Sequence, residues 1–145
     1  MKIILATDHA GFDLKNHVKE YLEKKKYNVE DFGAYEYDAL DGYPDFILPA
    51  ARVVGNSKST FGIIFGGSGQ GEAIAANRVK GVRAVVYYDG PKKIIELSRQ
   101  HNDANILSLG ARFISKKKAI EVIDLWLKTP FEGGRHLTRI RKLDL

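Results

Sequence analysis

The chain alternates short apolar strands with amphipathic helices five times, and this order limits its fold more than any other feature. Runs rich in Val, Ile, Leu and aromatic residues, which are typical of strands, occupy residues 2–7, 27–33, 61–65, 82–88 and 104–110. Apolar residues at helical spacing occupy residues 11–25, 44–55, 71–79, 91–100 and 116–128. Five such units predict an α/β fold with one parallel sheet, helices on both faces, and ligands bound beyond the carboxyl ends of the strands.

Length, cysteine content and charge exclude several classes of protein. The 145 residues suffice for one domain with its own core, so we expect a single domain over residues 1–145. Without cysteine the chain has no disulfide, thiolate metal site or cysteine nucleophile. No apolar run approaches the ~18 residues of a membrane span or forms a secretory signal, which predicts a cytoplasmic protein without a membrane partner. The net charge of +5 is spread among 18 acidic residues, which favours a small anionic ligand over nucleic acid.

The segment GGSGQG, residues 66–71, joins a predicted strand to a predicted helix. Glycines let backbone N–H groups converge, and a helix N-terminus adds its positive end, so the segment predicts a cradle for a phosphate or an oxyanion. No Lys-Ser/Thr pair follows it, and Glu72 stands where a dinucleotide-binding fingerprint needs a third glycine. Nucleotide binding therefore loses support. The alternative is that the glycines only allow tight packing.

Glu72 is unexpected beside a cradle for negative charge. An acid in the first turn of a helix ordinarily stabilises the helix dipole, which is the plainer interpretation. A carboxylate at this place could instead move protons while backbone N–H groups hold a developing enolate oxygen. The helix dipole would depress the pKa of Glu72, so a useful base would need burial to raise it again.

Two further polar clusters border strands. Asp8 and His9 end the first strand, and His101, Asn102 and Asp103 precede the last strand, which Arg112 follows. We expect these clusters to converge on one edge of the sheet. The plainer alternatives are that Asp8 caps a helix and that the second cluster satisfies loop backbone.

The C-terminal tail, at about residues 130–145, breaks at Pro130 and then carries arginines. Arg135 and Arg139 are four residues apart, so a short helix would place both on one face, where a guanidinium pair suits a phosphate dianion. A nucleic-acid contact is the weaker alternative, because no stacking aromatic residues are interleaved with these arginines.

These residues carry a resemblance over nearly the full length. DHAGF, GGSGQGEAIAANR, LSRQHNDANILSLGAR and FEGGRH resemble motifs of the ribose-5-phosphate isomerase B family, which includes the galactose-6-phosphate isomerase subunits. The resemblance implies a Rossmann-like three-layer αβα sandwich with a five-stranded parallel sheet. It also implies a homodimer or dimer of dimers with shared sites, and aldose–ketose isomerisation through a cis-enediolate with neither metal nor cofactor.

The resemblance also implies roles for individual residues. Glu72 becomes the base, His101 helps to open the furanose ring, and Ser68 stands where the family has Ser or Thr among its catalytic residues. The amides of Gly67, Ser68, Gly69, Gln70 and Gly71 become the enediolate cradle. The remaining substrate contacts would be Asp8, His9, Tyr43, Asn102, Arg112, Arg135 and Arg139, with some of the arginines reaching across from a partner subunit.

One departure from the better-known family pattern concerns the base. Many members have a cysteine at the position of Gly66 and an aliphatic residue at the position of Glu72. This chain is similar to a second branch, seen in actinobacterial enzymes with GGSGNGE, that uses the glutamate.

Three functions remain open at this stage. The first is interconversion of ribose 5-phosphate and ribulose 5-phosphate in the pentose phosphate pathway, and the second is the same chemistry on a six-carbon aldose phosphate such as allose 6-phosphate or galactose 6-phosphate. The segment 33–45, with Tyr43, is expected to set the pocket depth that decides between these two. The third is a phosphosugar-binding module without turnover, against which the presence of both Glu72 and His101 argues.

Overall fold

A computed structural model describes residues 1–144 and contains one five-stranded parallel sheet. The strands are β1 (Lys2–Thr7), β2 (Asn28–Asp31), β3 (Thr60–Gly66), β4 (Ala84–Tyr87) and β5 (Ile106–Gly110). They lie in the order β2-β1-β3-β5-β4, and every neighbouring pair is parallel. The helices are α1 (Phe12–Lys24), α2 (Pro44–Gly55), α3 (Gln70–Asn77), α4 (Lys93–Gln100), α5 (Lys116–Lys128) and α6 (Arg135–Ile140), and a short 3-10 helix, η1 (His9–Gly11), precedes α1.

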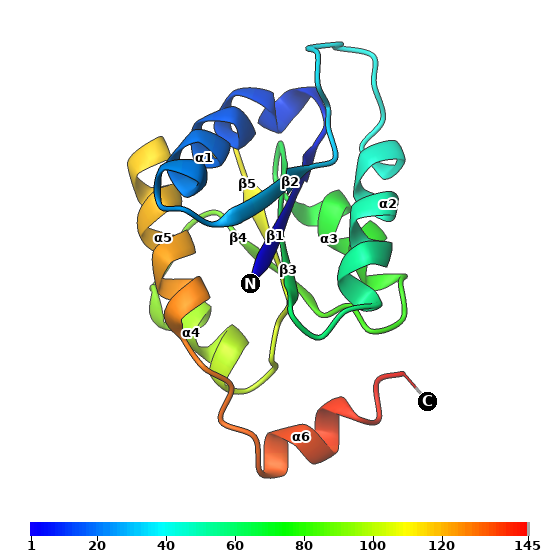
Figure 1. Cartoon of the computed structure of the whole chain (residues 1–145), viewed down its shortest axis with the longest axis vertical. Coiled ribbons are helices and arrows are strands. Elements are labelled where there is room, and N and C mark those ends of the chain that lie inside the picture. Colours follow the sequence, from blue (N-terminus) through cyan, green and yellow to red (C-terminus); the bar gives the residue numbers. More distant parts are fainter. Residues whose placement is uncertain (145) are drawn as a thin grey trace.

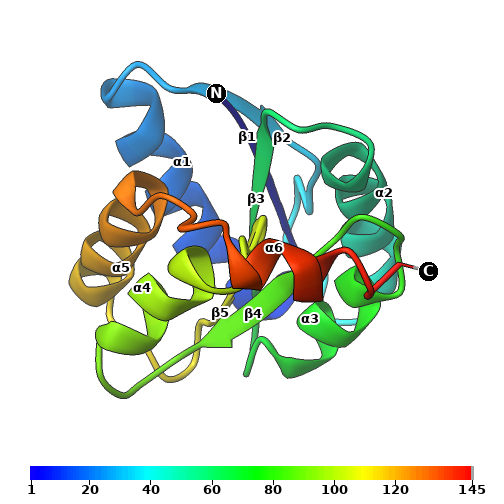
Figure 2. The same cartoon turned by 90° about the horizontal axis from the view of Figure 1, so that it is seen from below.

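The sheet is covered on both faces, which confirms the predicted three-layer αβα fold (Figure 1). Side chains alternate along β1, so that Ile3 and Leu5 pack with α1, α4 and α5, while Ile4 and Ala6 pack with α2 and α3. Figure 2 shows the two groups of helices on opposite sides of the sheet, with α6 lying across its end. No helix within residues 1–144 combines the length and apolar character needed to cross a membrane.

The order of the strands marks a candidate ligand-binding position at their carboxyl ends. The chain leaves β1 toward α1 on one face of the sheet and leaves the adjacent β3 toward α3 on the other face. Such a divergence between neighbouring parallel strands is where ligands bind in open α/β sheets. The glycine-rich segment 66–71 and the segment 8–11 both lie at this point.

A buried ion pair fixes the first residues after β2, which lie near the carboxyl end of β1. Lys15, which is fully buried, donates hydrogen bonds of 2.9 Å to both carboxylate oxygens of Asp31 and one of 2.7 Å to the carbonyl of Ala34. Burial alone would raise the pKa of Asp31, but the bonds from Lys15 and the Gly33 amide hold it below its ordinary value. The start of the connection from β2 to α2 is thereby anchored beside β1.

Candidate active site

The segment 66–71, which we call the glycine loop, is held in shape by the neighbouring strand. Gly69 adopts a φ of +80° as the N-cap of α3, a conformation that L side chains rarely take. A Cβ atom there would also lie 3.1 Å from the hydroxyl of Ser108, which donates a 2.7 Å hydrogen bond to the Gly69 carbonyl. Within the loop, the hydroxyl of Ser68 accepts a 3.2 Å bond from the amide of Gln70. Contacts within the protein therefore fix the shape of the loop, as an anion cradle requires.

The Glu72 carboxylate lies beneath this loop, in space that a side chain at residue 66 would otherwise occupy. A Cβ atom added to Gly66 would overlap both carboxylate oxygens of Glu72. The residue is only 5% exposed. Burial raises the pKa of the Glu72 carboxyl, its own backbone amide opposes that rise, and the nearby Asp8 adds to it. The raised pKa makes the Glu72 carboxylate a stronger base than an exposed glutamate.

Asp8 and His9 lie next to the glycine loop because β1 and β3 are neighbours in register, with Thr7 opposite Phe65. Asp8 is buried and accepts a 2.9 Å hydrogen bond from the amide of Ala10, so the plainer expectation that it caps a helix is confirmed for η1. The Nδ1 atom of His9 lies 2.7 Å from Oδ1 of Asp41, which also accepts a 3.0 Å bond from the His9 amide. Sequence reasoning missed Asp41, since nothing in the pattern links it to His9 across the connection from β2.

Tyr43 and Arg112 complete this first group of predicted site residues. The Tyr43 ring covers Gly71, where an added Cβ atom would lie 2.9 Å from Cζ. The Arg112 guanidinium lies over Gly67, where an added Cβ atom would be 3.1 Å from Nη1. The backbone amide of Arg112 also donates a 3.1 Å hydrogen bond to the Gly67 carbonyl. The structure thus brings together at the carboxyl edge of the sheet Asp8, His9, Tyr43, Gly67, Ser68, Gly69, Gln70, Gly71, Glu72 and Arg112.

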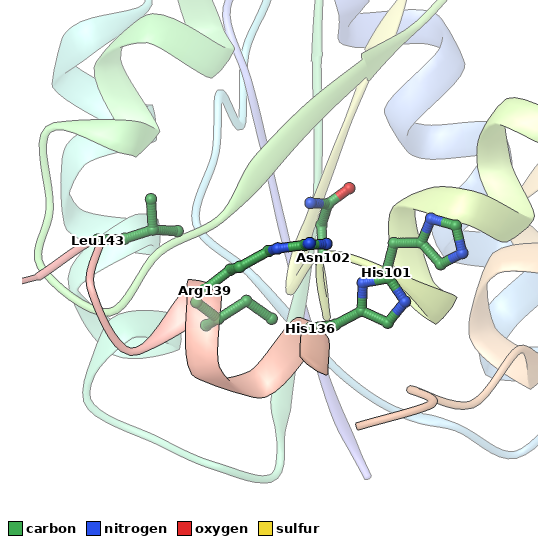
Figure 3. A pocket seen from close by; sticks show the side chains of 6 residues that line it. His101, Asn102, His136, Arg139 and Leu143 are labelled. Carbon is green, nitrogen blue, oxygen red and sulfur yellow. The ribbon is translucent and has the colours of Figure 1, made fainter. Parts of the chain in front are cut away.

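The second group lies around a pocket of about 280 Å³ beside α6 (Figure 3). His101, Asn102 and Arg139 line this pocket with His136, Ile140 and Leu143. The rings of His101 and His136 are stacked, with centroids 4.2 Å apart and planes 13° apart. Burial, helped by the charge of Arg135, lowers the pKa of His136 below its ordinary value. The tail does form a short helix, α6, and it carries both Arg135 and Arg139.

The expectation that all polar clusters converge on one edge is wrong for a single chain. His101 and Asn102 follow α4 and precede β5, whereas the glycine loop follows β3. Because β3 and β5 are parallel, the start of β5 and the end of β3 lie at opposite edges of the sheet. Figure 1 shows α6 beyond the amino edge, far from η1 at the carboxyl edge. Arg112, which follows β5, is the one member of the last cluster that joins the glycine loop.

Comparison with known proteins identifies the family. The family model described as Ribose/Galactose Isomerase matches residues 3–143. This chain belongs to the Ribose/Galactose Isomerase family. A ribose-5-phosphate isomerase B of Mycolicibacterium paratuberculosis is 38% identical over 141 residues, which span 97% of this chain and 87% of that protein.

Solved structures of Ribose/Galactose Isomerase family members have the same fold. The crystal structure of ribose-5-phosphate isomerase B from Mycoplasma genitalium with bound ribulose-5-phosphate is 43% identical and superposes with a TM-score of 0.93, covering 98% of this chain and 93% of that one. Ribose-5-phosphate isomerase B of Clostridium thermocellum is also 43% identical, with a TM-score of 0.91 over 99% of this chain and 95% of that one. The resemblance seen in the motifs is thereby confirmed at the level of family and fold.

Gly66→Ala tests whether the Glu72 carboxylate occupies the space next to the Cα atom of Gly66. The new methyl group has to displace the Glu72 carboxylate, and overpacking of this kind costs about 1–3 kcal/mol. We expect a lower free energy of unfolding, measured by chemical denaturation, together with a loss of isomerase turnover. The matched control is Gly66→Ala with Glu72→Ala, which should regain stability but not turnover. A single variant as stable and active as the wild type would contradict the assigned position of the carboxylate.

Proposed function

We propose that this chain is an aldose–ketose isomerase that interconverts ribose 5-phosphate and ribulose 5-phosphate. The observation that carries the proposal is the buried carboxylate of Glu72 beneath a preformed glycine loop, in a chain whose full-length relatives are named ribose-5-phosphate isomerase B. Proton transfer through an enediolate needs a base beside groups that stabilise an oxyanion, and here a carboxylate with a raised pKa lies beside a glycine-rich loop at a helix N-terminus.

The proposed reaction moves one proton between adjacent carbons of the open-chain sugar. Glu72 removes the proton from C2, and the electrons shift so that the C1 aldehyde oxygen becomes an enediolate oxygen, which the amides of residues 67–71 stabilise. A hydroxyl proton then passes between O2 and O1, a step that we assign to Ser68 because it carries the one hydroxyl within the loop. Protonated Glu72 returns its proton to C1, which leaves a ketone at C2. The cycle consumes no cofactor, and we assign it no metal.

We further propose that the active site is shared between two copies of the chain. One sugar phosphate cannot contact both the glycine loop and the pocket beside α6 of the same chain, since they lie at opposite edges of the sheet. A symmetric dimer that sets the glycine loop of one copy against α6 of the other would supply Glu72, Asp8, His9 and Tyr43 from one side. The other side would supply His101 for ring opening, Asn102 as a substrate contact, and Arg135 and Arg139 for the phosphate.

This proposal treats residues 1–145 as a single isomerase domain, with the arginine-bearing tail acting as part of the partner's site. It includes a homodimer or dimer of dimers working on a small sugar phosphate in the cytoplasm. Dissociation into single chains should therefore abolish turnover even where each chain stays folded.

Turnover of purified protein on ribose 5-phosphate, allose 6-phosphate and galactose 6-phosphate, with a chelator present, tests the proposal. We expect ribose 5-phosphate to be converted fastest. As the pH falls, kcat/KM should decline while Glu72 becomes protonated, with an acid limb above the usual range of a glutamate because its pKa is raised. Binding of all three sugars without conversion would overturn the proposal in favour of a sensing module.

A six-carbon substrate is the second candidate, and the family's description as Ribose/Galactose Isomerase is the observation that favours it. The Tyr43 ring lies against Gly71, beside the loop where we propose the sugar binds, so we expect it to limit the length of the sugar. Faster conversion of allose or galactose 6-phosphate than of ribose 5-phosphate would establish this alternative.

A further inference from the structure

A cluster of metal-ligand side chains lies at the amino edge of the sheet, apart from the glycine loop. His101, Glu132 and His136 each offer one ligand atom, and these atoms lie within 4.8 Å of one another. The backbone amide of Glu132 donates a 3.1 Å hydrogen bond to the carbonyl of Gln100, which holds the connection before α6 against the end of α4. Figure 3 shows the imidazoles of His101 and His136 side by side at the rim of the pocket. Two separate segments are therefore fixed so that three donors meet.

The Nε2 atom of His136 lacks a partner in this cluster. The residue is 95% buried, since only 5% of its surface is exposed, and within residues 1–144 its Nε2 atom makes no hydrogen bond. The nearest carboxylate oxygen, Oε2 of Glu132, is 3.9 Å away, which is too far for a hydrogen bond. Buried polar atoms are normally satisfied, so an unpartnered nitrogen aimed at a carboxylate points to a ligand between them.

We propose that His101, Glu132 and His136 form a binding site for Zn²⁺ or a similar transition-metal ion, and that this ion inhibits the isomerase. Two imidazoles and one carboxylate are the donor set of open zinc sites, with bonds of about 2.0–2.2 Å. Tetrahedral bonds of that length place two donor atoms about 3.4 Å apart. Oε2 of Glu132, now 3.9 Å from Nε2 of His136, therefore has to move slightly closer to complete the site. Because the two rings are nearly parallel, His101, the more exposed ring, has to tilt to complete the site.

The surroundings define which ions this site can take. Arg139 lines the same pocket and Arg135 lies one residue before His136, so any cation meets nearby positive charge. Imidazole bonds offset that repulsion for Zn²⁺, Ni²⁺ and Cu²⁺, but Mg²⁺ and Ca²⁺ prefer oxygen ligands and gain little here. Inhibition, unlike binding, rests on the proposed function, because the ion would occupy the ring nitrogen of His101 that the ring-opening step needs.

A second cluster in the chain provides a matched control. Asp8, His9 and Asp41 also offer three ligand atoms within 4.8 Å. There, however, the Nδ1 atom of His9 is already hydrogen-bonded to Asp41 over 2.7 Å, and Asp8 caps η1. We expect this cluster to bind Zn²⁺ far more weakly than the cluster beside α6.

Isothermal titration of the apo protein with Zn²⁺, and absorption spectra after addition of Co²⁺, test binding without reference to activity. We expect visible absorption of low-coordinate Co²⁺ in the wild type. Zn²⁺ affinity should fall about tenfold or more in Glu132→Gln and His136→Asn, and stay unchanged in His9→Gln. In turnover assays, Zn²⁺ should inhibit the wild type, a chelator should restore it, and Mg²⁺ should have no effect. Glu132→Gln should keep wild-type turnover but resist the inhibition.

The outcomes separate this proposal from the proposed function. Absence of Zn²⁺ binding, or equal binding by Glu132→Gln and the wild type, overturns the metal site whatever the enzyme's substrate. Binding that is lost in His9→Gln rather than in Glu132→Gln overturns it as well. Zn²⁺ binding that depends on Glu132, in a protein that converts no sugar phosphate, supports the metal site and overturns the isomerase assignment alone.

Discussion

Glu72→Gln should lower kcat for ribose 5-phosphate by about 10²–10⁴-fold, the usual contribution of a general base. The substitution keeps the shape of the side chain beneath the glycine loop but removes the carboxylate that we propose accepts the C2 proton. Because the phosphate contacts lie elsewhere, we expect KM to change little. Steady-state kinetics of the two proteins, with circular dichroism as the control for folding, provide the measurement. A variant that keeps near-normal kcat would exclude Glu72 as the base.

The same substitution should stabilise the protein at neutral pH. Since the pKa of Glu72 is raised in the folded state, the folded protein binds the proton more tightly than the unfolded chain does. The stability that comes with protonation is fully present below the unfolded pKa and is lost as the pH rises through the folded pKa. Glutamine is neutral at every pH, so the melting temperature of the variant should exceed that of the wild type at pH 7, and the difference should shrink in acid. A lower melting temperature at pH 7 would contradict the burial of a charged carboxylate.

Mixing two inactive variants should restore turnover, which is the largest gain we expect from any experiment on this chain. In the proposed shared site, Glu72→Gln would disable the glycine-loop side and His101→Asn would disable the side beside α6. In a mixed dimer both lesions fall in one site and the other site is intact. Refolding the variants together at equal amounts should therefore give about a quarter of the wild-type sites, since half of the dimers are mixed and each holds one good site.

Two controls define the complementation result. Each variant refolded alone should stay inactive, and a mixture prepared without unfolding should gain activity only as fast as the subunits exchange. If the refolded mixture stays as inactive as its components while size-exclusion chromatography shows dimers, the two groups do not share a site between chains. The catalytic roles of Glu72 and His101 would then have to be assigned within one subunit.

The fold could be predicted because its signals are local. Each strand is a short run of branched and aromatic residues, and each helix has an apolar stripe, so β1, β3 and α5 lie within one residue of the expected ranges. Strands β2 (Asn28–Asp31) and β4 (Ala84–Tyr87) are shorter than the expected ranges 27–33 and 82–88. Residues at both ends of these apolar runs lie outside the register that pairs each strand with its neighbour. Element boundaries depend on such details of pairing, which periodicity does not contain.

The site could be predicted only in part, because its geometry depends on chain direction and burial. The sequence indicated an acid at the exit of an anion cradle, but the pKa of Glu72 depends on burial and on Asp8, which lies 64 positions away in the chain. His101 was grouped with the glycine loop because it precedes a strand, although an element before a parallel strand lies at the opposite edge. The sequence did not indicate Asp41 as a site residue. Its contact with His9 joins the segment after β1 to the segment between β2 and α2, and no sequence pattern relates these two segments.

The missing side chain of Gly66 also restricts how this enzyme can change during evolution. Residues 66 and 72 compete for one volume, so a lineage that replaced a glutamate base, the role we propose for Glu72, with a cysteine at position 66 would have to alter both positions. Introducing the cysteine first forces it into the carboxylate, and removing the glutamate first leaves a protein with no base. Each single step passes through an impaired intermediate, so we expect the two positions to covary among relatives, with glycine accompanying glutamate and cysteine accompanying an aliphatic residue. Chains with glutamate at position 72 and chains with cysteine at position 66 would then be separated by less active intermediates.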